Sequence, residues 1–153
     1  MKDQIDGKLE NAISKLEKAE KDYLFFKCIT PQGDLYFNIL FGNLYESLEL
    51  NLMSMRYYMK AKLTTDKLML TNPDCALVFC NLGSLMIRLR EYEWAFRCFW
   101  KAKNIREYTI GGDTIDSAVI YNNLGVCGYY LQNFYASHGF FKLSSEILKE
   151  KLG

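Results

Sequence analysis

The feature that most constrains the fold of this chain is an internal repeat with a period of about 42 residues. The segment Asn81–Gly83 (Asn-Leu-Gly) recurs at Asn123–Gly125, and a weaker copy, Leu40–Gly42, lies 41 residues before the first. Each copy precedes a small, a large and a small residue at positions i, i+4 and i+7, which lie on one face of a helix. These stripes are Ser54, Tyr58 and Ala61; Ala95, Phe99 and Ala102; and Ser137, Phe141 and Ser144, with an earlier one at Ala12, Leu16 and Ala19.

The spacing predicts an all-α chain of about seven helices, arranged as antiparallel pairs. The expected helices span about 4–27, 35–49, 51–70, 75–89, 91–109, 117–131 and 133–150. Asp34, Asp74 and Asp116 precede apolar runs at matching places, and we expect their carboxylates to cap the free N–H groups of helix starts. The expected single domain, 1–153, consists of a half repeat 1–33 and of repeats 34–73, 74–115 and 116–153.

Glycines occupy matching positions inside three of these expected helices, at Gly42, Gly83 and Gly125. A glycine in a helix interior costs roughly 1 kcal/mol relative to alanine. Their recurrence therefore predicts close approach between helices, with no room for a Cβ atom.

These residues resemble tetratricopeptide repeats, which place Leu-Gly between aromatic residues and follow it with an Ala, Phe, Ala stripe. The copy that matches best has Phe79, Leu82, Gly83, Met86, Tyr92, Ala95, Phe99 and Ala102. In the next copy Gly128 stands where the family has an aromatic residue, which implies either a gap or a close contact. The long period resembles the variant of kinesin light chains, in which the second helix of each pair is extended. The resemblance implies a right-handed α-solenoid with the second helices outside.

Composition excludes several classes of function. The chain has 19 basic and 18 acidic side chains, so it creates no strong field for nucleic acid, and no apolar run is long enough to insert into a membrane. Five cysteines without a Cys-x-x-Cys pair predict reduced thiols and a cytoplasmic location, with cytoskeletal association only by analogy to the family. His138 is the only histidine, so we expect no metal site, no cofactor and no enzymatic activity.

The resemblance implies that the first helix of each repeat lines a concave groove that binds a peptide of a partner protein. Asparagine amides there could hold a peptide backbone while aromatic and aliphatic residues accept side chains, and Arg88 could contact an acidic residue. The expected groove residues are Tyr36, Ile39, Asn43, Leu77, Asn81, Ser84, Ile87, Arg88, Val119, Asn122, Asn123, Val126, Tyr129 and Tyr130. The family subtype that clamps chaperone C-termini is excluded, because Ile39, Val119 and Asn123 replace its basic groups.

Two alternatives remain open beside this adaptor or scaffold function. The first is self-association through the repeat ends, as a homodimer, unless the chain is a fragment of a longer array. Its basis is the apolar composition of the last helix, with Phe140, Phe141, Leu143, Ile147 and Leu148. The second is a thiol-dependent enzyme or redox sensor, which would need a cysteine with a lowered pKa.

Overall fold

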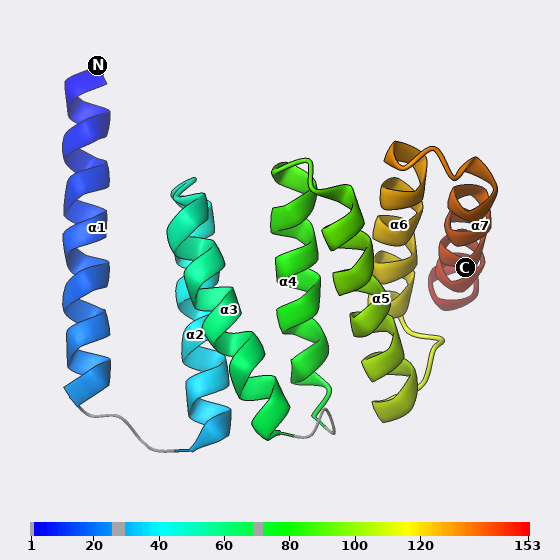
Figure 1. Ribbon diagram of the computed structural model, residues 1–153, viewed down its shortest axis with the longest axis horizontal. Coiled ribbons are helices and arrows are strands. Elements are labelled where there is room, and N and C mark those ends of the chain that lie inside the picture. Colours follow the sequence, from blue (N-terminus) through cyan, green and yellow to red (C-terminus); the bar gives the residue numbers. More distant parts are fainter. Residues whose placement is uncertain (1, 26–29, 69–71) are drawn as a thin grey trace.

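The computed structural model describes residues 2–25, 30–68 and 72–153, and all regular structure in these ranges is helical (Figure 1). The helices are α1 (Lys2–Phe25), α2 (Pro31–Ser47), α3 (Asn51–Lys67), α4 (Asp74–Arg88), α5 (Tyr92–Thr109), α6 (Ile115–Tyr130) and α7 (Phe134–Leu152). α2 and α3, α4 and α5, and α6 and α7 form antiparallel pairs that stack along the molecule. α1 lies at one end without a paired helix and contacts α2 and α3 through side chains such as Tyr23 and Glu20. The prediction of an all-α repeat is therefore confirmed.

The second helices are the longer ones in the last two pairs. α5 has 18 residues against 15 in α4, and α7 has 19 against 16 in α6, whereas α2 and α3 have 17 each. In Figure 1, α3 passes in front of α2. The first helices α2, α4 and α6 contact one another in order and so form one layer, and the second helices α3, α5 and α7 pack against it as the other layer.

Each helix pair is held together by a glycine of the first helix and an aromatic ring of the second. A Cβ built on Gly83 would lie 2.7 Å from ring carbons of Phe99, and one on Gly125 would lie 2.7 Å from Phe141. Gly42 has the same relationship with Tyr58. The prediction of close helix approach at these three glycines is confirmed.

Gly128 marks a second close approach within the last pair. A Cβ there would lie 3.2 Å from the backbone nitrogen of Ser137, so the two backbones nearly touch. The missing aromatic residue thus produces a close contact and not a gap. The Ser137 hydroxyl donates to the carbonyl of Gly125 at 2.8 Å, and the Ser144 hydroxyl donates to that of Ala118 at 2.7 Å. In the last pair, two serines therefore take alanine positions of the stripe with their buried hydroxyls hydrogen-bonded. The hydroxyl of Ser54, at the matching position of the first pair, is buried without a partner.

The turn inside each pair has the same backbone conformation three times. Glu49, Arg90 and Gln132 have φ of 59°, 63° and 60°, which is the left-handed region. The N–H group of Arg90 donates to Ile87, and that of Glu91 donates to Met86, which is the hydrogen-bond pattern of a Schellman motif. The other two turns repeat this pattern. One corner geometry therefore sets the angle of every pair.

The prediction that three aspartates cap helix starts is wrong. Thr30 caps α2 by accepting from the N–H of Gly33, and Thr114 caps α6 by accepting from Ser117, both at 3.1 Å. The aspartates lie in the first turns of α2, α4 and α6, where they still complement the positive end of the helix dipole.

The aspartate carboxylates instead bond side chains of the preceding segment. Asp34 accepts from the hydroxyl of Tyr23 at 3.1 Å, Asp74 accepts from Gln32 at 3.1 Å, and Asp116 pairs with Arg106 at 2.9 Å. Each carboxylate thus joins the start of a first helix to the part of the array before it.

Candidate functional site

All of the expected groove residues lie on the first helices, α2, α4 and α6. α4 lies between α2 and α6 and contacts both. Five of the expected side chains are exposed by 37% to 57% although they are large and apolar or aromatic. They are Tyr36, Leu77, Val119, Tyr129 and Tyr130. Such residues on neighbouring helices form an interaction surface when they are contiguous.

The seam between α2 and α4 is closed by polar contacts at successive levels. The hydroxyl of Tyr36 and the amide of Gln32 donate to Asp74. The amide of Asn81 donates to the Oδ1 atom of Asn43 at 2.9 Å, and that same oxygen accepts from the hydroxyl of Tyr58. The asparagine amides expected to hold a peptide are therefore partly engaged with each other.

Arg88, at the end of α4, makes the last of the polar contacts along this seam. Its guanidinium pairs with Glu46 at 2.9 Å and donates to the side chain of Asn51 at 3.2 Å. An acidic ligand residue would therefore have to compete with Glu46 for the guanidinium of Arg88.

The seam between α4 and α6 differs. No side-chain hydrogen bond joins these two helices within the described ranges. Half-buried residues line this seam from both sides, with exposed ones at its margins. The expected groove residues here are Leu77, Asn81, Ser84, Ile87, Val119, Asn123, Val126, Tyr129 and Tyr130. Among the described residues, the polar side chains here therefore make no hydrogen bond across the α4–α6 seam, although the amide of Asn81 donates to Asn43 on α2.

A hollow of about 510 Å³ lies where the groove meets α1. It is lined by Tyr23, Tyr36, Phe37, Leu40 and Asn43, with Gly33 and Ile39. Ile39, one of the expected groove residues, is only 5% exposed, so it forms part of the floor of this hollow. The ring of Tyr23 stacks on Phe37 with centroids 3.5 Å apart, which fixes one wall.

Tyr129 and Tyr130 belong to an aromatic cluster at the edge of the groove, where the corners of the last two pairs meet. The ring of Tyr130 stacks on Tyr92 at 4.2 Å, and Tyr129 contacts Phe134 edge-on at 5.7 Å. The sequence analysis missed the contribution of Tyr92 and Phe134. The recurrence of aromatic residues on both sides of the turn at 131–133 was the signal that could have found it.

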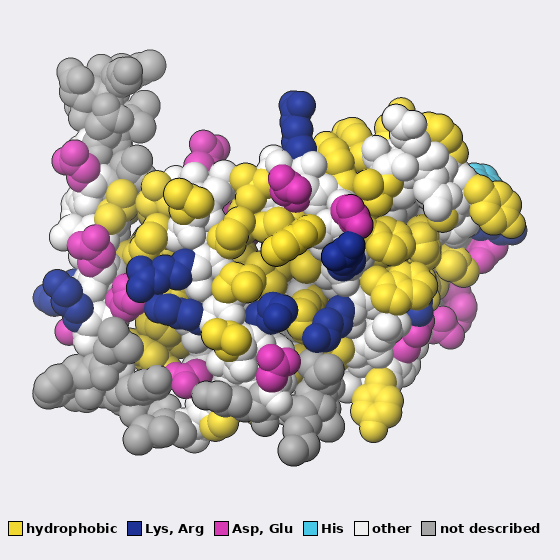
Figure 2. All heavy atoms as spheres, in the orientation of Figure 1, with side chains coloured by type: hydrophobic (Ala, Val, Ile, Leu, Met, Phe, Trp, Pro, Cys, Tyr) yellow, Lys and Arg dark blue, Asp and Glu magenta, His cyan; other side chains and the backbone are white. Residues whose placement is uncertain are grey.

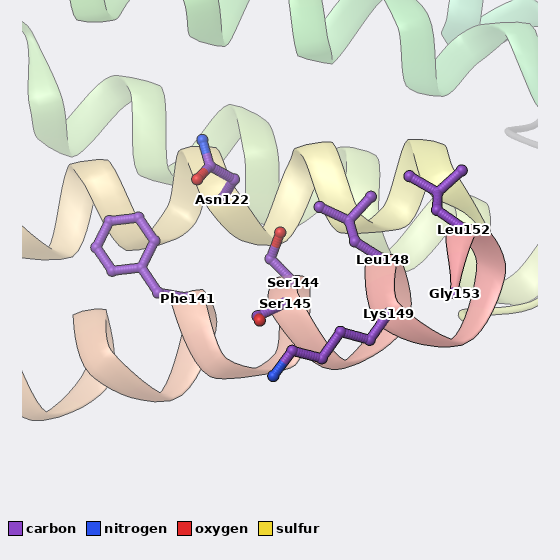
Figure 3. Close-up of a pocket in the computed structure, with 8 residues that line it drawn as sticks. All are labelled: Asn122, Phe141, Ser144, Ser145, Leu148, Lys149, Leu152 and Gly153. Atoms are coloured by element: carbon purple, nitrogen blue, oxygen red, sulfur yellow. The ribbon is translucent and has the colours of Figure 1, made fainter.

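Asn122 is placed away from the groove, in an open hollow of about 650 Å³ at the end of the array (Figure 3). Figure 3 shows Leu148 and Leu152, one turn apart on α7, pointing to the same side. One repeat earlier, the position of Asn122 is held by Cys80, which packs against the core. Asn122 thus lines the hollow on the end face of the last pair, together with residues of α7.

The end face is less apolar than the sequence suggested. Ile147 is buried, and Phe140 and Leu148 are half-buried, so the last pair covers much of its own apolar surface. Phe141 and Leu143 remain exposed, by 37% and 43%.

Charge is divided between the two layers. α2, α4 and α6 together carry four Asp and Glu residues and one Arg, a net charge of −3. α3 and α5 carry eight Lys and Arg residues and three Asp and Glu residues, a net charge of +5. The near-neutral total therefore hides two layers of opposite sign.

The described thiols are not activated. Burial raises the pKa of Cys80 and of Cys127 to about 11, and it also raises the pKa of Cys75 and Cys98. This is the opposite of what a thiolate nucleophile requires. Cys28 lies outside the described residues. His138 is exposed on α7.

In the described residues, no group of three or more His, Cys, Asp or Glu side chains is arranged to bind a metal ion. None of their helices has both the length and the apolar composition that crossing a membrane requires.

Comparison with known proteins supports the fold. No protein-family model matches this chain, and no curated protein matches it. Its structure is similar to the crystal structure of BtubC (BKLC) from P. vanneervenii, with a TM-score of 0.73 and 18% sequence identity. The match covers 98% of this chain, which spans 59% of the length of that one. The chain thus has a TPR-like helical repeat fold.

Proposed function

We propose that this chain is a non-catalytic adaptor or scaffold domain of the cytoplasm, built from one half repeat and three repeats of the long type found in kinesin light chains. It binds a peptide segment of a partner protein in the groove of its first helices. The TPR-like fold supports a role in protein interaction or scaffolding in general. The groove itself is supported by the exposed aromatic and aliphatic side chains on α2, α4 and α6.

The α4–α6 half of the groove is the favoured docking surface. A ligand that entered the α2–α4 seam would have to break the contacts of Asn43, Arg88 and Asp74, at a cost that the ligand's own hydrogen bonds must offset. Beside the α4–α6 seam, the side chains of Val119 and Tyr129 are exposed, so a ligand can contact them without any rearrangement of the protein.

The negative charge of the first-helix layer indicates which peptides it accepts. With four carboxylates and one guanidinium on α2, α4 and α6, an acidic peptide would be repelled, and a neutral or basic one would not. We therefore expect an extended or helical peptide with one apolar anchor near Val126 and Tyr129 and no run of acidic residues. Its affinity should be about micromolar, as is usual for small transient interfaces.

The test is binding of a partner peptide to groove variants. A partner is captured from the source cell, its binding segment is mapped with overlapping peptides, and the dissociation constant is measured by calorimetry. Val119→Asp combined with Tyr129→Ala should weaken binding at least tenfold. Tyr108→Ala changes a tyrosine that is 80% exposed near the end of α5 and should leave affinity unchanged. Equal affinity for the wild type and the groove variant would reject this groove as the binding surface.

The second candidate function is self-association through the end face, because Phe141, Leu148 and Leu152 line an open hollow there (Figure 3). In the internal stack, a following helix pair covers the equivalent face. Sedimentation at micromolar concentration should then show a dimer that Leu152→Glu dissociates. A monomer at every concentration tested, with no binding of a hydrophobic dye, would exclude this role.

A further inference from the structure

The outer layer has a hollow of its own, on the side opposite to the groove. It lies between α3 and α5, has a volume of about 290 Å³, and reaches down to α4. Its lining residues are Met55, Met59 and Lys62 from α3, Leu82 and Met86 from α4, and Trp94, Arg97 and Cys98 from α5. We name it the α3–α5 hollow.

The walls of the α3–α5 hollow are apolar and accessible. Trp94 is 58% exposed and Met59 is 40% exposed, whereas Leu82 and Met86 beneath them are buried and close the floor. Unbranched methionine side chains adapt their shape to what they contact and are frequent in binding surfaces. The volume lies just below the range of small-molecule sites, which begins at about 300 Å³. It therefore suits one large side chain of a partner.

Positive charge surrounds this apolar recess. Lys62 and Arg97 line it, and Lys101 lies one turn beyond Cys98, with its Nζ atom 4.7 Å from the ring centre of Phe79. Within the described residues, Lys62 and Lys101 have no carboxylate partner, and Arg97 pairs only with Glu93 of its own helix. Figure 2 shows Lys and Arg side chains among hydrophobic ones on the face where α3 lies in front.

The summed charge of the two helices that line the hollow points the same way. The net charge of +5 on α3 and α5 attracts an acidic partner and repels a basic one. A bilayer surface is a poorer match, because the floor of the hollow lies beneath its rim and a flat surface would not reach Leu82 or Met86.

We propose that the α3–α5 hollow binds an acidic segment of a second protein. One large apolar side chain of that segment packs against Met55, Met59 and Met86, and its flanking carboxylates pair with Lys62, Arg97 and Lys101. The domain then has two docking surfaces of opposite charge and can bridge two different partners. This inference does not depend on which peptide occupies the groove.

The test is the selection of binding peptides from a display library that represents all side-chain chemistries, at 150 mM salt. Peptides that also bind the Met59→Glu variant are removed by counter-selection. Enriched peptides should carry one aromatic or large aliphatic residue flanked by Asp or Glu. Lys62→Glu combined with Lys101→Glu should raise their dissociation constants at least tenfold. Arg56→Glu reverses an exposed charge elsewhere on α3 and should change them less than twofold. Melting curves of all variants show whether the fold is intact.

Tryptophan fluorescence shows separately whether an enriched peptide binds at the α3–α5 hollow. In a Trp100→Phe background, Trp94 is the only tryptophan, and its emission should shift when an enriched peptide binds. Tyr129→Ala in the groove should leave this signal unchanged.

Two outcomes overturn the proposal. One is a selection without enrichment, or with peptides that bind Met59→Glu as tightly as the wild type. The other is binding to vesicles that contain phosphatidylserine, abolished by the same variants, when no peptide binds; the hollow would then be a membrane contact.

Discussion

Gly83 of α4 and Phe99 of α5 meet so closely that the ring of Phe99 occupies the space of the Cβ that Gly83 lacks. The partners are 16 residues apart, as are Gly42 and Tyr58 and also Gly125 and Phe141. One contact, repeated three times, therefore sets the distance between the helices of each pair.

Replacing Gly83 by alanine should lower the free energy of unfolding by about 1–3 kcal/mol, because a Cβ at 2.7 Å forces a fully buried ring to move. The matched control is Gly139→Ala on α7, where nothing lies within 4 Å. That change should stabilise the fold by up to about 1 kcal/mol through helix propensity. Urea denaturation monitored by circular dichroism measures both values. A Gly83→Ala variant as stable as the control would contradict the close contact.

The corner residue Arg90 should be replaceable by glycine with a gain in stability. Its φ of 63° costs an ordinary residue about 1 kcal/mol, and glycine adopts this conformation without strain. Arg90→Gly should therefore raise the free energy of unfolding by about 0.5–1 kcal/mol, and Gln132→Gly should do the same. Arg90→Ala is the control, since alanine keeps the strain. Thermal melts in which the Arg90→Gly variant is no more stable than the Arg90→Ala variant would contradict this corner geometry.

The pair formed by Arg88 and Glu46 should couple α2 to α4 measurably. A double-mutant cycle with Arg88→Met and Glu46→Gln is expected to give about 0.5–1 kcal/mol at low salt, and less in 1 M salt, because both side chains are partly exposed. The comparison is Arg97 with Glu93, each 70% exposed within one helix, where the coupling should be about 0.3 kcal/mol. A coupling of zero between Arg88 and Glu46 at low salt would mean that the cross-seam contact does not form in solution.

The buried thiols predict how stability depends on alkaline pH. The pKa of Cys80 and Cys127 is about 11 in the folded protein, against 9.0 as the ordinary value. Above pH 9 the unfolded chain loses thiol protons first, so the stabilisation is complete below pH 9 and is lost as the pH rises through 11. Urea titrations between pH 8 and 11 should show this decline.

A variant with Cys80→Ala and Cys127→Ala should decline less steeply than the parent over the same range. Identical slopes for the two proteins would show that these thiols do not contribute.

Sequence alone could predict the repeat architecture because its determinants are local and recur. The glycine register was visible at Gly42, Gly83 and Gly125, and glycine inside a helix has few explanations besides close packing. The helix caps could not be assigned in this way, because Thr30 and Asp34 are both plausible caps and only the path of the backbone decides between them.

The interaction surfaces were less predictable, because they depend on which residues of different repeats meet. Arg88 looked like a free cation until Glu46, 42 residues earlier, was placed against it. Met55 and Met59 have the helical spacing of a core stripe. Only the structure, which places Trp94 of α5 on the other side of the α3–α5 hollow, shows that Met55 and Met59 line this hollow.

The difference between the two seams also gives the array an uneven stiffness. Spreading α2 from α4 must break the bonds of Asn81 and Arg88, so this end of the groove keeps a fixed width. α6 is bonded to α5 through Asp116 and Tyr121, near its start, while in its second half Leu124 and Cys127 are buried in the core and Tyr130 stacks on Tyr92. Widening the α4–α6 seam would therefore disturb apolar packing but break no side-chain hydrogen bond between these two helices in the described ranges. We expect this half of the groove to adjust to ligands of different thickness more readily than the α2–α4 half.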